Sequence, residues 1–380
     1  MLNYFDIELT DEERLVQRTA REWVEAEAMP LIADYFEKGT FPRQLVPQMA
    51  ELGFFGASLP QYGAGLPYSC YGLICQELER CDSGLRSFIS VQSSLSMYAI
   101  YAFGSEEQKD RYLPKMVKGE LLGCFGLTEH DHGSDPAGME TRAVPDGTDW
   151  VINGSKMWIT NGTIADVAII WATTPDGIRG FAVDTDAPGF TAREVEHKLS
   201  LRASVTAELH FDDLRVPGGA LLPGTRSLGS ALRCLNEARF GIAWGTVGAA
   251  MACLEYSLNY AKVREQFGRP IAGFQLTQQK FADMLTSITQ GQLVALQLAR
   301  LKDGGRLRPQ QVSLAKRANA MMALEVARSA RTILGGNGIS LEHPIIRHLV
   351  NLETVITYEG THEIHTLVLG QDLTGIAAYS

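Results

Sequence analysis

A glutamate near the C-terminal end of the chain is placed where a carboxylate can act as a base. Glu359 lies in the segment Thr357–His362, after a mostly apolar stretch that is expected to be helical. An aromatic residue precedes it and a glycine follows it, so we expect the chain to turn there and to aim the carboxylate at a target. An apolar setting disfavours the charged form of a carboxyl group, which raises its pKa and strengthens it as a base. The plain alternative is a surface glutamate near a helix end.

A second chemical candidate is the glycine-rich segment Gly335–Ile339. A dinucleotide-binding fingerprint follows a strand and opens a helix, whereas this segment closes a long helical stretch. The segment therefore favours a turn that ends a helix. A glycine turn can also let a backbone approach a phosphate closely, so both interpretations can hold.

Two histidine motifs do not support a metal site. His362 and His365 are three residues apart, whereas the zinc-binding HExxH helix places its histidines four apart. His130 and His132 flank Asp131 but have no distant ligand cluster to complete a site. We predict no metal.

Two further groups leave their role open on sequence alone. Trp158, Ile159, Thr160 and Asn161 end a strand in a turn, which suits either a core tryptophan or a flat ring and a hydroxyl beside a planar cofactor. Arg86 is the only charged residue between Asp82 and Glu106, so a guanidinium in this setting needs a fixed anion. Spacing alone favours Glu79, seven residues earlier on the same helical face, over a carboxylate brought by a substrate.

Length and composition bound the class of protein. The 380 residues are enough for two or three domains, and 45% hydrophobic with 21% charged residues is ordinary for a globular enzyme. The net charge of -10 argues against nucleic acid as a partner.

Compartment and membrane signals are weak. Six cysteines without a CxxC pair are typical of reduced thiols in an intracellular protein. The segment Met1–Asp6 shows no secretory signal. The uncharged stretch Ser87–Ser105 contains six serines and a glutamine, which favours a buried helix over a membrane span.

The first third of the chain is expected to be helical. Thr10 and Glu13 have the spacing of a capping box, and Cys70–Arg80 is a second predicted helix. Four prolines are expected to divide this region into short helices: Pro30, Pro42, Pro47 and Pro60.

Short β-type runs separated by turn residues follow from about residue 123 to about 223. Examples of the predicted strands are Cys124–Thr128, Trp150–Asn153, Met157–Thr160, Val167–Trp171, Gly180–Val183 and Ala207–Phe211. Breakers such as Pro145–Gly147 are expected to mark the turns.

Helical patterns return after Gly224. Apolar residues between 240 and 261 recur at spacings of four and three, which predicts a long helix of an antiparallel bundle. Long helices are also expected at 275–303 and 310–334, with a shorter one before Glu359. We therefore predict an α+β chain with a helical domain at 1–121, a β-barrel-like middle domain at 122–224 and a four-helix-bundle domain at 225–380.

Taken together, these motifs resemble the acyl-CoA dehydrogenase family, and within it the glutaryl-CoA dehydrogenases, over nearly the whole chain. The matching strings are Glu77–Arg80, Asp82–Gly84, Arg86–Ser87, Ser90–Ser94, Gly123–Glu129, Gly133–Asp135, Trp158–Asn161, Leu235–Asn236, Ala238–Arg239, Gln266–Gly268, Leu334–Ile339 and Thr357–His362. The family pattern has proline at position 130, in a loop that lies against the flavin, where this chain has His130.

The resemblance implies a non-covalent FAD. It assigns to the flavin the middle-domain residues Phe125, Leu127, Thr128, Ser134, Trp158, Ile159 and Thr160. It assigns to the adenine and pyrophosphate end of a neighbouring subunit's FAD the residues Arg264, Phe267 and Gln275, and to the same end Gly335, Gly336 and Gly338, with Thr361 as a further cofactor residue. A cofactor shared between subunits makes a homotetramer the expected state.

The resemblance also implies the chemistry. Glu359 takes the α-proton of an acyl-CoA thioester while the β-hydride leaves to flavin N5. The developing enolate is stabilised by the Glu359 N–H and a ribityl hydroxyl of FAD. In the glutaryl-CoA dehydrogenases the arginine that matches Arg86 pairs with the distal carboxylate of the substrate. The other residues assigned to the substrate are Ser87, Glu79, Tyr358, Ser134, Asn236, Arg239 and Gly360.

The expected reaction is the oxidation and decarboxylation of glutaryl-CoA to crotonyl-CoA and CO2, with electron-transfer flavoprotein as acceptor. Tyr358 favours the decarboxylating type. The alternatives are another acyl-CoA substrate, a non-decarboxylating enzyme that yields glutaconyl-CoA, an oxidase that uses O2, and a catalytically silent acyl-CoA-binding subunit. The expected location is the bacterial cytoplasm, or the mitochondrial matrix for a mature eukaryotic chain.

Overall fold

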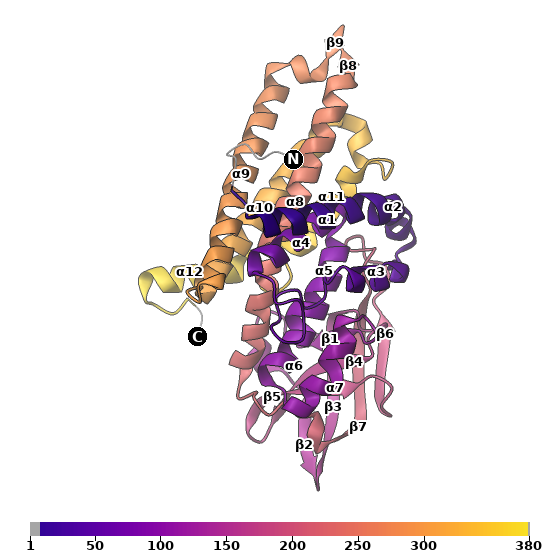
Figure 1. The fold of residues 1–380 in the computed structure, drawn as a ribbon, viewed down its shortest axis with the longest axis vertical. Helices are drawn as coiled ribbons and strands as arrows, with labels where there is room; N and C mark the ends of the chain where they lie inside the picture. The colour runs from indigo at the N-terminus through magenta and orange to yellow at the C-terminus, as the bar shows by residue number, and fades with distance from the viewer. Residues whose placement is uncertain (1–7, 379–380) are drawn as a thin grey trace.

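The computed structural model describes residues 8–378. The N-terminal segment Met1–Asp6 and the outer ends of the first and last predicted domains lie outside these residues. Figure 1 shows an elongated molecule with a helical bundle at one end, a β-sheet at the other and the first helices between them. The chain thus passes from helices to strands and back to helices, as the sequence predicts.

The first helices pack across the middle of the molecule. The α-helices are α1 (Asp11–Trp23), α2 (Met29–Lys38), α3 (Val46–Glu51), α4 (Tyr68–Cys81), α5 (Ser83–Ser90), α6 (Tyr98–Phe103) and α7 (Glu106–Val117). The predicted capping box is confirmed, because the Thr10 hydroxyl accepts from the Glu13 N–H and the Glu13 carboxylate accepts from the Thr10 N–H.

One expected break is wrong. Pro30 does not separate two helices, because α1 and α2 are joined by a π-helical turn, Val24–Ala28, just before the proline. The Met29 N–H donates five residues back to the Val24 carbonyl, and Pro30 sits in the first turn of α2. A first-turn position uses no backbone N–H, so the proline is tolerated there.

The uncharged stretch Ser87–Ser105 is buried, as the sequence predicts, and it contains a second π-helical segment, Val91–Met97, between α5 and α6. Gln92 in this segment accepts from the Gly123 N–H at 2.7 Å and donates to the carbonyls of Met116 and Leu121. One side chain therefore ties the helical region to the first strand. None of the helices in residues 8–378 is both long and apolar enough to cross a membrane.

The middle of the chain forms one curled sheet of seven strands. They are β1 (Gly123–Gly126), β2 (Arg142–Asp146), β3 (Asp149–Thr160), β4 (Val167–Thr174), β5 (Gly177–Asp184), β6 (Phe190–Glu194) and β7 (Thr206–Pro217). The pairing order is β1-β4-β2-β3-β7-β6, with β5 on β4. Most pairs are antiparallel, whereas β4 runs parallel to β1 and β2.

Two details of the predicted strands differ from the structure. The two runs between residues 150 and 160 are one continuous strand, β3, with register shifts that bend it. The strands β2 and β6 are not among the strands named from the sequence: β2 ends in the Pro145 and Asp146 of a presumed turn, and both strands are mostly exposed. An exposed strand lacks the apolar alternation by which strands are recognised.

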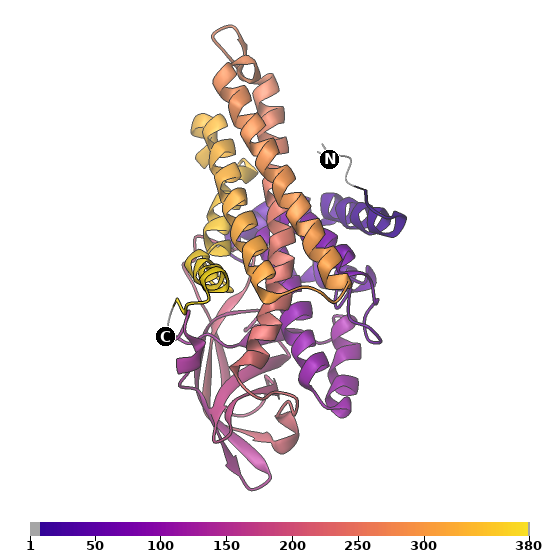
Figure 2. The ribbon, with the colours of Figure 1, turned by 90° about the vertical axis from the view of Figure 1, so that its left-hand side faces the viewer.

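The bundle contains the long helices α8 (Leu228–Val263), α9 (Gln275–Asp303) and α10 (Pro309–Ile333), followed by α11 (Pro344–Val355) and α12 (His362–Thr374). Figure 2 shows the three long helices side by side. The α8 helix begins earlier than predicted because Ser227 caps it through the Gly229 N–H. The short hairpin of β8 (Glu265–Gln266) and β9 (Arg269–Pro270) forms the far tip of the bundle.

Asn351 joins three parts of the molecule. Its amide nitrogen donates to Asp82 at the start of α5 at 2.9 Å, and its amide oxygen accepts from the Leu201 N–H at 2.7 Å. Asp82 is also paired with Arg347 of α11 at 3.1 Å. These buried contacts fix α11, and the turn that follows it, against both the first helices and the loop before β7.

We expect Asn351→Ala to destabilise the chain by about 2–4 kcal/mol, because it leaves the Leu201 N–H and one Asp82 oxygen buried without this partner. Urea unfolding of the FAD-loaded protein measures the change. The matched control is Asn153→Ala, which also removes two hydrogen bonds, both to Asp213 at the surface. Equal losses in the two variants would contradict the structural role of Asn351.

Candidate active site

The predicted turn at Glu359 is confirmed. After α11 ends at Val355, Glu359 adopts the left-handed conformation with φ 53°, and Gly360 follows with φ 95°. Thr361 then caps α12 by accepting from the Ile364 N–H. A non-glycine residue in this region is uncommon and is held by its surroundings.

The Glu359 carboxyl group is placed in a low-dielectric setting. Its Oε2 atom is buried and has no hydrogen-bond partner among the described residues. Burial raises the pKa of this carboxyl above its usual value, while the cations Arg86, Arg239 and Lys316 only partly oppose the rise. The alternative of an ordinary surface glutamate is therefore wrong, and the group has the character of a base.

Arg86 lies next to this carboxyl and is fully buried on α5. Its Nε donates to Glu79 Oε2 at 2.7 Å, so the partner that spacing favours is confirmed. Its Nη2 donates to the Tyr358 hydroxyl, and Ser83 donates to the other Glu79 oxygen at 2.8 Å. The third guanidinium nitrogen, Nη1, is buried with no partner among residues 8–378. This N–H group can still donate a hydrogen bond to a second anion.

A glycine of α8 makes room for the ion pair. A Cβ on Gly245 would lie 2.0 Å from Glu79 Oε2 and 3.0 Å from Arg86 Cγ, so any larger residue would displace the pair. Nothing in the sequence around Gly245 marks it as a site residue. The role of Gly245 could have been inferred only from Arg86 and Glu79, after the contact between α4, α5 and α8 was known.

Two cations hold the backbone of the turn. Arg239 donates to the Glu359 carbonyl at 2.6 Å and to the Asn236 side chain at 3.3 Å, so these two predicted substrate residues are linked to the Glu359 backbone. Lys316 of α10 donates to the carbonyls of Tyr358 and Gly360. Lys316 was missed by the sequence analysis, because a lysine in a helical stretch gives no sign of burial.

The remaining substrate candidates divide between the two sides of the site. Ser87 is buried next to Arg86 on α5. Ser134 is exposed in the loop after β1. No hydrogen bond of residues 8–378 joins it to the turn Tyr358–Gly360, which is called the base turn below.

The loop after β1 is anchored by one buried ion pair. Lys156 donates to Glu129 at 2.7 Å, and the Glu129 carboxylate also accepts from the N–H groups of Glu140 and Thr141. Burial alone raises the pKa of Glu129, but these hydrogen bonds lower it to about 2. His130, which departs from the family pattern, is 79% exposed and lies outside this anchor. The substitution is therefore accommodated at the surface.

Trp158 is not a core residue. Its side chain is 58% exposed, its φ is 63°, and it lies at the register shift of β3 between Lys156 and Ile159. Thr160 is partly exposed, whereas Ile159 packs in the core of the sheet. Phe125 and Leu127 are largely buried, and Thr128 is partly exposed. The indole and the two threonines are thus available to a ligand, and the Ile159 side chain is not.

The other expected cofactor residues lie far from this sheet. Arg264, Phe267 and Gln275 are at the tip of the bundle, opposite the strands in Figure 1, and Phe267 is 95% exposed. Gly335, Gly336 and Gly338 belong to the turn that ends α10, and Asn337 in this turn donates to Tyr260 of α8 at 3.0 Å. This turn ends a helix, as its sequence favours. The tip of the bundle and the sheet of a single chain therefore do not meet at one binding site.

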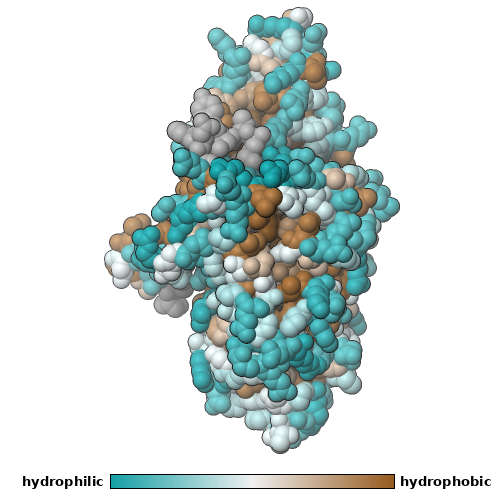
Figure 3. Space-filling view, in the orientation of Figure 1, coloured by the Kyte–Doolittle hydropathy of each residue, from teal (hydrophilic) through white to brown (hydrophobic). Residues whose placement is uncertain are grey.

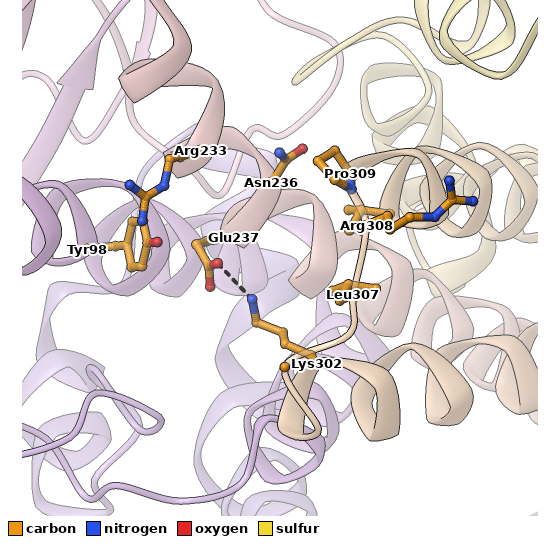
Figure 4. A pocket seen from close by; sticks show the side chains of 10 residues that line it. Tyr98, Arg233, Asn236, Glu237, Lys302, Leu307, Arg308 and Pro309 are labelled. Carbon is orange, nitrogen blue, oxygen red and sulfur yellow. Dashed lines mark hydrogen bonds and ion pairs between the residues drawn. The ribbon is translucent and has the colours of Figure 1, made fainter. Parts of the chain in front are cut away.

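A cavity of about 250 Å³ opens beside the base turn, between α6, the first turns of α8 and the loop from α9 to α10. Its wall includes Tyr98, Arg233, Asn236, Glu237, Lys302, Gly305, Leu307, Arg308, Pro309 and Val312. Figure 4 shows the Lys302 ammonium directed at the Glu237 carboxylate, a contact of 2.7 Å, and Arg233 beside the Tyr98 ring. Asn236 connects this cavity to Arg239 and so to the Glu359 backbone.

Other reactive side chains are inert in this setting. All six cysteines are buried and free, and burial raises the pKa of thiols such as Cys75 and Cys124 to about 12. Within residues 8–378 no group of three or more His, Cys, Asp or Glu side chains is arranged to hold a metal ion.

Three family models match the chain in order. "Acyl-CoA dehydrogenase, N-terminal domain" matches residues 10–120, "Acyl-CoA dehydrogenase, middle domain" matches 124–214, and "Acyl-CoA dehydrogenase, C-terminal domain" matches 228–374. The mitochondrial short-chain specific acyl-CoA dehydrogenase of Bos taurus is 35% identical over 379 residues, which cover 97% of this chain and 92% of that protein.

Two solved structures are more similar in sequence to this chain than the bovine enzyme is. A glutaryl-CoA dehydrogenase from Mycobacterium smegmatis is 58% identical with a TM-score of 0.97, over 98% of this chain and 97% of that one. A second glutaryl-CoA dehydrogenase from the same organism, in complex with FADH2, is 52% identical with a TM-score of 0.98, over 100% and 99% of the two chains.

The chain belongs to the acyl-CoA dehydrogenase family, and it is a flavin-dependent oxidoreductase whose cofactor is FAD. The predicted family, its likeness to the glutaryl-CoA dehydrogenases and the α+β class are confirmed. The side chains present fit a flavin, because an exposed indole and two hydroxyl-bearing residues are held on a rigid, bent strand and an anchored loop.

The raised pKa of Glu359 has a consequence for stability. A carboxyl whose pKa is higher in the folded than in the unfolded chain favours folding at low pH, and this contribution is lost as the pH rises through the folded pKa. Above the folded pKa the buried carboxylate is ionised, so the stability of Glu359→Gln relative to the native chain should be greatest there, and this advantage should shrink as the pH falls below the folded pKa.

Urea midpoints of the FAD-loaded proteins at several pH values measure this difference. Glu51→Gln, at an exposed position at the end of α3, is the matched control and should show no such trend. A difference that stays constant, or grows as the pH falls, would show that the Glu359 pKa is not raised. The same Glu359→Gln variant should lose about 10²–10⁴-fold in turnover, as expected for loss of a general base.

Proposed function

We propose that the chain oxidises and decarboxylates glutaryl-CoA to crotonyl-CoA and CO2. The observation that carries this proposal is the unpartnered Nη1 of the buried Arg86, whose charge acts on Glu359, which also has an unpartnered buried oxygen. A buried guanidinium donor without a partner is costly, and a carboxylate brought by the substrate would satisfy it. Monocarboxylic substrates offer no such group.

The charges around the base support the same substrate. Three cations, Arg86, Arg239 and Lys316, act on Glu359, whereas Glu79 is the other carboxylate at this end of the site. Burial lowers the pKa of Lys316 to about 7, so the guanidinium groups of Arg86 and Arg239 are the permanent positive charges beside Glu359, and they favour an additional anion. The distal carboxylate of a dicarboxylic acyl-CoA supplies it.

The residues proposed to hold FAD are those of the predicted set. Trp158, Thr160, Thr128 and Ser134 would lie against the flavin, with Phe125, Leu127 and Ile159 behind them and Thr361 beside the base turn. Bound FAD supplies the oxidising power by accepting the hydride from the β-carbon of the substrate. Arg264, Phe267, Gln275 and the turn at Gly335, Gly336 and Gly338 would serve the adenine and pyrophosphate end of a cofactor held by a second subunit.

Glu359 performs the proton transfer in this proposal. Its carboxylate takes the α-proton, and its backbone N–H donates to the thioester oxygen as negative charge develops there. No described residue accepts from this N–H, which leaves it free for the substrate. Arg239 and Gly360 keep the turn in place, and Asn236 with the cationic wall of the cavity suits the phosphates of coenzyme A.

Decarboxylation follows from the position of the distal carboxylate. After oxidation the γ-carboxylate of glutaconyl-CoA can leave as CO2, because the electron pair is delocalised through the dienolate onto the thioester. Glu359 then returns its proton to the γ-carbon and gives crotonyl-CoA. Arg86, Glu79, Tyr358 and Ser87 would hold the carboxylate in line for this step.

We also propose a homotetramer that passes electrons to electron-transfer flavoprotein. Large apolar side chains are exposed at and near the bundle tip, among them Val263, Phe267, Leu276 and Ile339. Figure 3 shows further hydrophobic residues gathered at mid-height, while the strand-rich end is mostly hydrophilic. Exposed apolar surface of this kind supports contacts between subunits.

The test is anaerobic mixing of the FAD-loaded protein with glutaryl-CoA, followed by flavin absorbance and by mass analysis of the acyl product. We expect bleaching of the flavin with crotonyl-CoA and CO2 as products. Bleaching that yields glutaconyl-CoA would retain the dehydrogenase and remove the decarboxylation. Bleaching by butyryl-CoA but not by glutaryl-CoA would favour a short-chain enzyme, the class of the bovine relative, and would leave Arg86 with a structural role.

A further inference from the structure

A buried lysine holds the backbone around the proposed base. Lys316 lies in the middle of α10 and is 1% exposed. Its Nζ donates to the Tyr358 carbonyl at 3.0 Å and to the Gly360 carbonyl at 2.8 Å. No salt bridge of the described residues includes it, so its charge is met by two backbone oxygens that flank Glu359. Burial disfavours the ammonium form and lowers the pKa of Lys316 to about 7, so a lysine at this position is costly.

The direction of these carbonyls fixes the direction of the neighbouring N–H groups. In a planar trans peptide the C=O and the N–H point to opposite sides. The Tyr358 carbonyl belongs to the same peptide unit as the Glu359 N–H. Because Lys316 draws the carbonyl toward α10, the Glu359 N–H points away from α10, and none of the described residues accepts from it.

The same arrangement repeats along the turn. Arg239 binds the Glu359 carbonyl and Lys316 binds the Gly360 carbonyl, so three successive oxygens each accept from a cation. Glu359 at φ 53° is in a left-handed conformation that a non-glycine residue keeps only where the surroundings fix it, and Gly360 follows at φ 95° without strain. Among residues 8–378, Lys316 is the residue whose side chain binds the backbone on both sides of Glu359.

We propose that Lys316 is a positioning residue for the reaction: by binding the Tyr358 carbonyl it aims the Glu359 N–H at the thioester oxygen. A donor on the carbonyl also polarises the peptide and strengthens its N–H as a donor. The residue acts through the backbone and touches neither the substrate nor the flavin. This inference rests on the proposed function, since it needs a thioester whose oxygen becomes negative.

Binding of two ligands separates this role from a general structural one. Acetoacetyl-CoA has an acidic α-proton and can bind as its enolate, whose oxygen resembles that of the transition state. Glutaryl-CoA bound to a protein that also carries Glu359→Gln stays unreacted and reports the ground state. A residue that aims the N–H should affect the enolate far more than the ground state.

The experiment compares Lys316→Met with the native chain, both FAD-loaded. We expect kcat to fall by about 10²–10³-fold, as when one oxyanion donor is lost, with KM changed by less than about threefold. Affinity for the acetoacetyl-CoA enolate should fall by at least about tenfold more than affinity for glutaryl-CoA in the Glu359→Gln background. Equal losses for both ligands, or an unchanged kcat, would overturn the proposal.

Lys198→Met is the matched control. Lys198 is also a largely buried lysine that caps backbone oxygens, those of Leu201 and Ser204, but it lies in the loop before β7. It should keep kcat within about threefold. If Lys316→Met binds no FAD, Lys316→Gln replaces it, and the same unequal loss of the two ligands is required.

The outcome is separable from the proposed substrate. If the native chain oxidises a monocarboxylic acyl-CoA instead of glutaryl-CoA, the kinetic comparison and the ground-state binding are made with that substrate. A retained fall in kcat would then keep the role of Lys316 while the glutaryl-CoA proposal fails. If the native chain oxidises glutaryl-CoA and Lys316→Met has normal kinetics, the glutaryl-CoA proposal stands and the proposed role of Lys316 fails.

Discussion

The proposed site depends on keeping the Arg86 guanidinium fully buried near the carboxyl group of Glu359, the proposed base. Glu79 neutralises most of the Arg86 charge at 2.7 Å, and Gly245 leaves the space in which the pair can lie. Without Glu79, the arginine would hold Glu359 in its ionised form more strongly and weaken it as a base. One donor of Arg86 is left over, and the proposed function follows from that donor.

The rest of the fold serves to bring these groups together from distant parts of the chain. Arg86 and Glu79 come from the first helices, Gly245 and Arg239 from α8, Lys316 from α10 and Glu359 from the turn after α11. Asn351 and the pair of Asp82 with Arg347 fix α11 against α5, which sets the distance between Glu359 and Arg86. A strained turn can act as a rigid support only because cations bind its three successive carbonyls.

The sequence predicted most of the fold, because long helices with apolar stripes and strands between turn residues carry clear periodic signals. The prediction failed at two places where the surroundings overrule local rules. Pro30 is accommodated in a helix after a π-helical turn, and the exposed strands β2 and β6 lack the alternation of apolar and polar residues. For the site, the sequence indicated Glu359 and Arg86 because a charge in an apolar segment is conspicuous. It could not indicate Lys316 or Gly245, since their roles arise only from the packing of α10 and α8, nor decide that Trp158 is exposed.

The most direct test of the account measures whether Arg86 recognises the distal carboxylate. Glutaryl-CoA and its monoamide, which has a neutral group of the same shape, are titrated anaerobically into FAD-loaded Glu359→Gln, with and without Arg86→Met. We predict that the acid binds about 10²-fold more tightly than the amide, and that Arg86→Met removes this preference. Equal binding of acid and amide to the protein that retains Arg86 would contradict the account.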